Sequence, residues 1–122
     1  MDTYRVLFVD DEEELVTTLV ERLEYRGIDA DFALNGNDAL KMMRQEPYDV
    51  VVVDLKMPGM SGAEVMQILL REYPKVPVLL ITGHGSLEDE PEEKPEGAFD
   101  YLHKPINLED LLAKIQEALE SR

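Results

Sequence analysis

The sequence predicts an α/β fold in which helices cover both faces of a parallel β-sheet. Short apolar runs rich in β-branched residues alternate along the chain with longer segments of helical period, which is typical of βαβ units. Five such runs can be counted, at residues 6–9, 29–33, 50–53, 76–81 and 99–102. The first, third and fourth are apolar at consecutive positions, as expected for strands buried on both faces. The second run alternates with polar residues, which suits an edge strand.

Helices are predicted after the first two strands. The first covers residues 13–26, with Gly27 at the position where a glycine commonly ends a helix. Its apolar stripe consists of Leu15, Leu19 and Leu23. Asn37 is expected to cap a short second helix, which ends before Pro47.

Two further helices are predicted, one after the third strand and one after the fifth. Ser61 is expected to cap the former and Asn107 the latter. The last helix has the clearest amphipathic stripe of the chain, formed by Leu108, Leu111, Leu112, Ile115 and Leu119.

Residues 84–97 break this pattern. A fourth helix is expected here to cover the sheet, but the segment reads HGSLEDEPEEKPEG, with six acidic residues and two prolines. Each proline removes a backbone donor and clashes with the preceding turn of a helix. We therefore expect this fourth helix to be shortened or disordered, as a frayed turn or a mobile loop.

Length and composition narrow the function classes. The 122 residues suffice for one domain, and we expect a single domain over residues 1–122. The net charge of −15 repels phosphate backbones, so no direct nucleic-acid partner is expected. The absence of cysteine excludes disulfides, thiolate metal sites and a cysteine nucleophile. The apolar runs are too short for a membrane span and residues 1–9 lack a secretory signal, so a cytoplasmic location is expected.

Polar residues follow four of the five apolar runs. Asp10 and Asp11 follow the first, Asp54 the third and Thr82 the fourth, and Lys104 comes one residue after the fifth. The carboxyl ends of parallel strands lie along one edge of an open sheet, where ligands bind at the switch point of strand order. We therefore expect three carboxylates, a hydroxyl and an ammonium to converge.

These residue types indicate a metal-assisted phosphoryl site. Close carboxylates raise one another's pKa unless a cation joins them. Carboxylates, a carbonyl and waters are the oxygen ligands that suit Mg²⁺. With Lys104 as a fixed cation and Thr82 as a hydroxyl donor, the set would bind and polarise a phosphoryl group. Each residue alone has an ordinary explanation as a helix cap or turn residue, and only their conjunction in this order favours a site.

The sequence resembles the receiver domain of two-component response regulators over essentially its whole length. The matching motifs are VLFVDDE at residues 6–12, VVVVDLKMPGMSG at 50–62, LLITGHG at 79–85 and GAFDYLHKPI at 97–106. The resemblance implies a flavodoxin-like (βα)₅ three-layer sandwich with strand order 2-1-3-4-5. It also implies a phosphorelay switch that takes a phosphoryl group from the phosphohistidine of a histidine kinase or histidine phosphotransfer protein.

The resemblance implies a role for each acidic residue of the site. Asp54 matches the phosphoacceptor. Asp11 matches the direct carboxylate ligand of Mg²⁺, Asp10 a neighbour that acts mostly through water, and the Lys56 carbonyl the backbone ligand. The expected metal site therefore comprises Asp10, Asp11, Asp54 and Lys56.

It also implies how the phosphoryl group is held and sensed. Thr82 matches the hydroxyl that moves to bond a phosphoryl oxygen, Gly83 a backbone donor, and Lys104 the ammonium that pairs with the phosphate. Tyr101 matches the aromatic switch residue that turns inward as Thr82 moves. The Lys104–Pro105 peptide bond is expected to be cis.

The implied output is a change of partner binding at the face made by the fourth helix, fifth strand and last helix. The expected partners are a downstream protein or an output domain, and a homodimer is a further expected assembly. The domain would catalyse its own phosphorylation and dephosphorylation without being a small-molecule enzyme. Phosphorylation is also expected to alter the order of residues 86–96.

Two other functions remain as alternatives. One is a receiver-shaped protein-binding module that does not use phosphorylation, which the unusual segment at 84–97 would favour. The other is a Mg²⁺-dependent phosphohydrolase, against which stands Lys56 where a second acid–base carboxylate would be needed. His84 and His103 are interpreted as loop residues rather than catalytic or metal-binding groups.

Overall fold

A five-stranded parallel sheet forms the centre of the structure, a computed structural model that describes residues 4–83 and 97–121. Its strands are β1 (Arg5–Val9), β2 (Asp29–Ala33), β3 (Val50–Asp54), β4 (Val78–Thr82) and β5 (Asp100–His103). They lie in the order β2-β1-β3-β4-β5, and every neighbouring pair is parallel. The predicted flavodoxin-like topology is confirmed.

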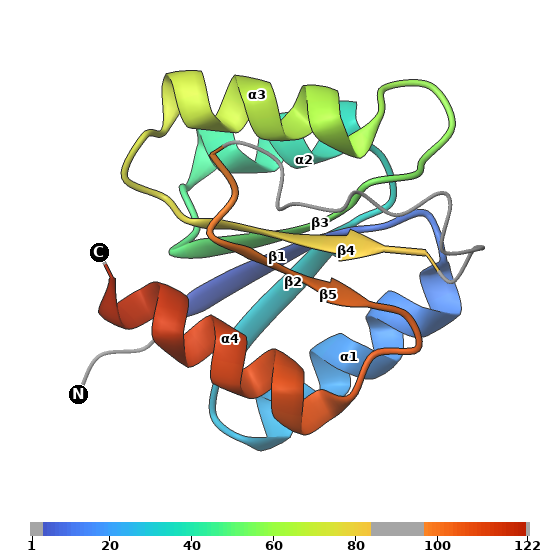
Figure 1. The fold of residues 1–122 in the computed structure, drawn as a ribbon, viewed down its shortest axis with the longest axis vertical. Coiled ribbons are helices and arrows are strands. Elements are labelled where there is room, and N and C mark those ends of the chain that lie inside the picture. Colours follow the sequence, from blue (N-terminus) through green and yellow to red (C-terminus); the bar gives the residue numbers. More distant parts are fainter. Residues whose placement is uncertain (1–3, 84–96, 122) are drawn as a thin grey trace.

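The helices of the described residues cover both faces of the sheet (Figure 1). They are α1 (Glu13–Tyr25), α2 (Gly36–Gln45), α3 (Gly62–Glu72) and α4 (Leu108–Glu120). In Figure 1, α2 and α3 lie above the sheet and α1 and α4 below it, which gives the three layers of the sandwich. The helix labelled α4 is the last helix of the chain, which the sequence analysis predicts after the fifth strand.

The core is divided by the sheet into two apolar clusters. Successive strand residues point to opposite faces, so Val6 and Phe8 of β1 pack with α1 and α4, whereas Leu7 and Val9 pack with α2 and α3. All five residues of β3 and of β4 are buried. This explains why these strands are apolar without alternation, and why a polar residue at their ends is conspicuous.

Capping side chains fix where the helices begin. Ser61 and Asn107 cap α3 and α4 as predicted, each accepting a hydrogen bond from the backbone amide three residues later. The prediction of Asn37 as the cap of α2 is wrong, because Asn35 is the cap. Asn35 exchanges two hydrogen bonds with Asp38, at 2.8 and 3.0 Å, whereas the residue three positions after Asn37 is the buried Leu40.

Strands β4 and β5 lie slightly later in the sequence than predicted. Strand β4 begins at Val78 rather than Val76, because the Val76 amide donates to the Tyr73 carbonyl in the turn that follows α3. At their carboxyl ends, the strands β3, β4 and β5 each extend one residue further than predicted, to Asp54, Thr82 and His103 respectively. The site residues Asp54 and Thr82 are therefore held by the sheet itself rather than by the loops beyond it.

Three expectations lie wholly or partly outside the described residues. These are the shortened or disordered fourth helix at 84–97, the change of order at 86–96 and the interpretation of His84 as a loop residue. Among the helices that the structure describes, none combines the length and the apolar character needed to cross a bilayer.

Candidate functional site

Four polar side chains are buried within residues 4–83 and 97–121, and all four come from the carboxyl ends of the strands. Their exposed fractions are 1% for Asp10, 3% for Asp54, 4% for Thr82 and 8% for Lys104. Asp10 follows β1 directly, Asp54 and Thr82 end β3 and β4, and Lys104 follows β5. Burying an ionisable side chain costs folding free energy. Three such side chains buried at one place therefore indicate a functional site.

Backbone hydrogen bonds bring these four residues to the same edge. The Asp10 amide donates to the Ala33 carbonyl at 3.1 Å, which continues the pairing of β1 with β2 by one residue. The Lys104 amide donates to the Thr82 carbonyl at 2.9 Å, which does the same for β5 and β4. Of the five side chains predicted to converge, these four therefore lie at one edge of the sheet.

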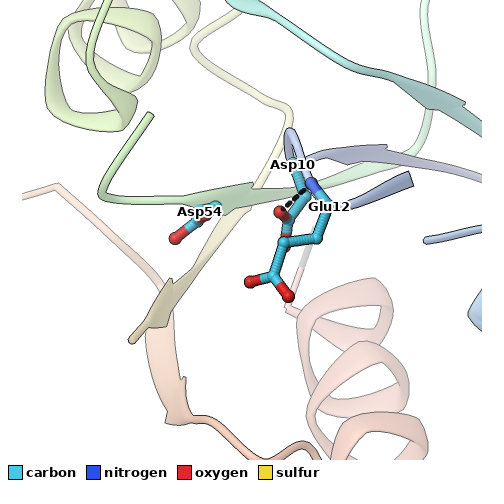
Figure 2. A group of neighbouring side chains, drawn as sticks. All are labelled: Asp10, Glu12 and Asp54. Carbon is cyan, nitrogen blue, oxygen red and sulfur yellow. Dashed lines mark hydrogen bonds between the residues drawn. The ribbon is translucent and has the colours of Figure 1, made fainter. Parts of the chain in front are cut away.

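Three carboxylates gather at the centre of this edge (Figure 2). Asp10, Glu12 and Asp54 each offer one oxygen, and these oxygens all lie within 4.8 Å of one another. The Glu12 amide also donates to Asp10 Oδ1 at 2.9 Å, the contact dashed in Figure 2. Because like charges repel at this separation, the group requires a cation to be stable in its ionised form.

The Lys104 ammonium provides one cation for this group. Its Nζ lies 3.2 Å from Asp10 Oδ2 and 3.5 Å from Asp54 Oδ2, and it also donates to Glu12 Oε1. Burial alone lowers the pKa of Lys104, but the hydrogen bond to Glu12 and the charges of Asp10 and Asp54 outweigh it and raise the pKa. Lys104 is therefore a permanent positive charge at neutral pH.

Opposing effects act on the pKa of Asp54. Burial, followed by the charge of Asp10, raises its pKa from 3.8 to about 6, against the opposing effects of Lys104 and of the Lys56 amide. That amide donates to Asp54 Oδ1 at 3.3 Å. The carboxylate is ionised at neutral pH, yet it is less well stabilised than an ordinary aspartate and gains from any further positive charge.

The donor set fits a hard divalent cation. Three carboxylates face one another, and Asp10 Oδ2 is a buried oxygen that accepts no hydrogen bond although the Lys104 ammonium is near. Oxygen ligands of this kind are the ones that Mg²⁺ takes in proteins. One ammonium shared by three carboxylates leaves negative charge in excess, so a metal ion would complete the charge balance.

The structure and the predicted ligand set differ at one position. Asp11 is exposed and lies outside this carboxylate group, in which Glu12 takes part instead. Glu12 was missed because an acidic residue at the start of a helix is usually explained as a cap. It does occupy the N-cap position of α1, but its side chain makes no capping hydrogen bond and reaches Lys104.

The backbone after β3 is packed closely against Asp54. The Gly62 amide donates to the Leu55 carbonyl at 3.1 Å, and a Cβ at Gly62 would clash with the Asp54 carbonyl oxygen. Only glycine permits this approach, so Gly62 fixes the loop that carries Lys56. At the other side of the site the Lys104–Pro105 bond is cis, as predicted.

Thr82 and its neighbours form the side of the site nearest β5. Thr82 Oγ1 lies 2.8 Å from His103 Nδ1 and 3.4 Å from the Leu102 carbonyl oxygen. Tyr101 is half-buried and meets the His103 ring edge to face, with ring centroids 5.3 Å apart. His103, interpreted from the sequence as a loop residue, is the last residue of β5. Gly83 follows Thr82 and is half-buried.

This arrangement suits nucleophilic chemistry by a carboxylate. Asp54 offers an oxygen nucleophile beside a fixed ammonium, and Thr82 offers a hydroxyl from the neighbouring strand. A carboxylate that is already ionised needs no general base to act as a nucleophile. The product of attack on a phosphorus atom would be an acyl phosphate.

Comparisons with known proteins agree with this geometry. Residues 6–116 match the family described as "Response regulator receiver domain". The chain is 36% identical over 119 residues to the transcriptional regulatory protein YkoG of Bacillus subtilis, covering 98% of this chain and 52% of that protein. It is 33% identical over 122 residues to a putative response regulator, NtrX-like, of Rickettsia bellii, covering 98% of this chain and 26% of that protein.

A solved structure shows the same fold. The response regulator receiver domain protein from Clostridium thermocellum superposes with a TM-score of 0.87 at 31% identity, over 97% of this chain and 95% of that one. The chain thus spans about half and about a quarter of the two curated relatives, but nearly all of this receiver structure.

Proposed function

Because the chain belongs to the receiver domain family of two-component response regulators, we propose that it is a phosphorelay switch in which Asp54 accepts a phosphoryl group. The donor is the phosphohistidine of a histidine kinase or of a histidine phosphotransfer protein. The observation that carries the proposal is the buried Asp54 carboxylate, 3.5 Å from Lys104 Nζ and grouped with Asp10 and Glu12.

The proposed reaction moves one phosphoryl group between two side chains. An Asp54 carboxylate oxygen attacks the phosphorus atom, a new O–P bond forms, and the P–N bond to the donor histidine breaks. The released imidazole takes up a proton from solvent. Lys104 pairs with the phosphoryl oxygens, and the Thr82 hydroxyl and the Gly83 amide donate hydrogen bonds to them.

The metal proposed for the site is Mg²⁺. Asp10 and Asp54 would hold it, with Asp11 and the Lys56 carbonyl as the resemblance implies and Glu12 as the carboxylate that the structure adds. When bound, Mg²⁺ supplies positive charge for the phosphoryl oxygens. Asp10 supports this role because its Oδ2 is buried without a hydrogen bond.

The proposed output follows from the new charge on Asp54. A phosphoryl group needs partners that an unmodified carboxylate does not, so Thr82 moves toward it and Tyr101 turns inward behind Thr82. The affected face is the one that the resemblance implies, of which the structure describes β5 and α4. We propose that it binds a downstream protein or an output domain, since the curated relatives extend well beyond the matched region.

Four further features complete the proposal. Residues 1–122 act as one receiver domain, this domain lies in the cytoplasm, and a homodimer is one of its assemblies. Nucleic acid is not a direct partner of this domain, because the net charge is −15.

Intact-mass measurement after treatment with acetyl phosphate and Mg²⁺ tests the proposal. The wild type should gain one phosphoryl group and Asp54→Asn none. Asp29→Asn is the matched control, since it removes the same charge from an exposed residue at the opposite end of the sheet. It should be phosphorylated like the wild type.

The two alternatives predict different results, one in this experiment and one in an assay of phosphate-ester turnover. A binding module that does not use phosphorylation gains no adduct. A phosphohydrolase turns over a generic phosphate ester, and Asp54→Asn abolishes that turnover. Either result would replace the phosphorelay proposal.

A further inference from the structure

The Thr82 hydroxyl is engaged by β5 in this structure. Thr82 and His103 are register partners at the ends of β4 and β5, and Thr82 Oγ1 lies 2.8 Å from His103 Nδ1. The Leu102 carbonyl oxygen is a second partner at 3.4 Å. The hydroxyl is buried, so these contacts replace the hydrogen bonds it would make with water.

The direction of the hydroxyl proton follows from these two partners. If His103 Nδ1 is unprotonated, the Thr82 hydroxyl donates to it. If Nδ1 carries a proton, the hydroxyl accepts from it and donates to the Leu102 carbonyl. In both cases the proton points to β5 and away from the neighbouring β3, where Asp54 lies.

A phosphoryl group on Asp54 must compete with this arrangement. Phosphoryl oxygens only accept hydrogen bonds, so Thr82 can serve them only as a donor. To do so, the hydroxyl must give up its donation to β5. The hydrogen bond that the Thr82 hydroxyl donates to β5 therefore stabilises the unphosphorylated form alone, and its acceptor is His103 when Nδ1 is unprotonated.

His103 also contacts the other proposed switch residue. Tyr101 and His103 lie two positions apart on β5, hence on the same face of the strand, and their rings meet edge to face. One side chain thus links the hydroxyl that would sense the phosphoryl group to the aromatic residue that would report it.

We propose that His103 is a positioning residue that holds Thr82 in the unphosphorylated arrangement and sets how readily the switch changes state. The inference rests on the proposed phosphorelay function and adds to it a residue for which the sequence predicted no role. A contact made only in one of two states shifts the equilibrium toward that state by its own free energy. Loss of the His103 contact therefore favours the phosphorylated form.

Binding of beryllofluoride in the presence of Mg²⁺ tests this inference, with amide and methyl NMR signals of Thr82 as the readout. His103→Phe keeps a ring beside Tyr101 but has no polar atom for Thr82. We expect it to bind beryllofluoride about three- to tenfold more tightly, the effect of one net hydrogen bond. His103→Asn places a polar atom at the same number of bonds from the backbone as Nδ1, and should restore the wild-type affinity.

Three controls separate positioning from a general structural effect. Affinity for Mg²⁺ alone should be equal in the wild type and both variants, because His103 is not part of the carboxylate group. His103→Leu, which lacks both the polar atom and the ring, should shift beryllofluoride affinity in the same direction as His103→Phe. In a Thr82→Ala background, His103→Phe should have no effect.

Failure of the inference is distinguishable from failure of the proposed function. If the wild type binds beryllofluoride but His103→Phe binds it with unchanged or lower affinity, the positioning role is wrong. An effect that persists without the Thr82 hydroxyl would also overturn it. If the wild type neither gains a phosphoryl group nor binds beryllofluoride, the function itself is wrong, and this is seen before any variant is compared.

Discussion

At the residue scale, the ionised Asp54 carboxylate is expected to destabilise the fold that carries it. Its pKa is about 6 in the folded protein and near 3.8 when unperturbed, so between these values the folded state binds more protons than the unfolded state. The free energy of unfolding therefore falls as pH rises from about 4 to about 6. Above about pH 6 the free energy of unfolding falls no further on account of Asp54.

Asp54→Asn should therefore stabilise the metal-free protein at pH 7. The pKa difference corresponds to about 1–3 kcal/mol. Urea unfolding with a chelator present measures this gain, which should shrink to nothing as pH is lowered through about 4. A variant that is less stable than the wild type at pH 7 would contradict the electrostatic description of the site.

Lys104→Met tests the ammonium of the same group. The substitution keeps most of the side-chain volume but leaves three carboxylates without their shared cation. We expect a loss of about 2–4 kcal/mol at pH 7, since an uncompensated buried charge is costly. Urea unfolding measures the loss, and added Mg²⁺ should recover part of it.

Lys114→Met is the matched control for Lys104→Met. Lys114 also pairs with an aspartate, Asp100, at 2.5 Å, but both side chains are about one-third exposed. An ion pair in such a position contributes about 1 kcal/mol or less. Equal losses in the two lysine variants would show that Lys104 is an ordinary surface pair rather than the cation of a buried site.

Single residues also mark the limits of prediction from the sequence. Asp54, Thr82 and Lys104 were predictable because all three come at or just after the ends of apolar runs, and the carboxyl ends of parallel strands lie along one edge of the sheet. Glu12 was not, because its place at a helix start offers a sufficient local reason. His103 was not either, because its contact with Thr82 depends on the register of β4 and β5, which a sequence does not reveal.

At the scale of the elements, the start of α2 offers a test of how the helices are delimited. Asn35 accepts from the Asp38 amide and is the cap, whereas Asn37 lies in the first turn and is exposed. Asn35→Ala should cost about 0.5–2 kcal/mol. Asn37→Ala should be neutral or slightly stabilising, because alanine is the better helix former.

Thermal unfolding of these two variants checks the assignment. Only Asn35→Ala is expected to lower the melting temperature. A loss confined to Asn37→Ala would restore the cap predicted from the sequence. Two asparagines two residues apart could not be separated by cap preference alone, and the acidic residue three positions after Asn35 is the feature that distinguishes them.

The order of strands and helices was predictable at this scale because it follows from hydrophobic pattern. The first, third and fourth apolar runs became the fully or largely buried strands β1, β3 and β4. The ends of the strands were less predictable. The Val76 amide donates to the Tyr73 carbonyl in a turn, and Thr82 pairs with His103 in the sheet. Such choices depend on hydrogen bonds between distant segments.

At the scale of the whole molecule, the charge excess at the site should make stability depend on divalent cations. A metal that binds only the folded state stabilises it in proportion to the logarithm of its concentration. We expect Mg²⁺ to raise the melting temperature more than NaCl at equal ionic strength, although NaCl also helps by screening the net charge of −15.

Differential scanning calorimetry in the two salts measures this difference. Asp10→Asn is the informative variant, because it removes the buried oxygen that lacks a hydrogen bond and lies beside Lys104. The specific effect of Mg²⁺ should be lost in this variant while the effect of NaCl remains. An equal response of the wild type to both salts would mean that no metal site forms around these carboxylates.

The central claim is that residues from four strand ends form one phosphoryl-accepting site at Asp54. Borohydride reduction followed by peptide mapping tests it most directly, since it converts an aspartyl phosphate to homoserine and so marks the modified residue. After reaction with acetyl phosphate and Mg²⁺, the account predicts homoserine at position 54 and at no other aspartate. Homoserine at another position, or none at all, would contradict it.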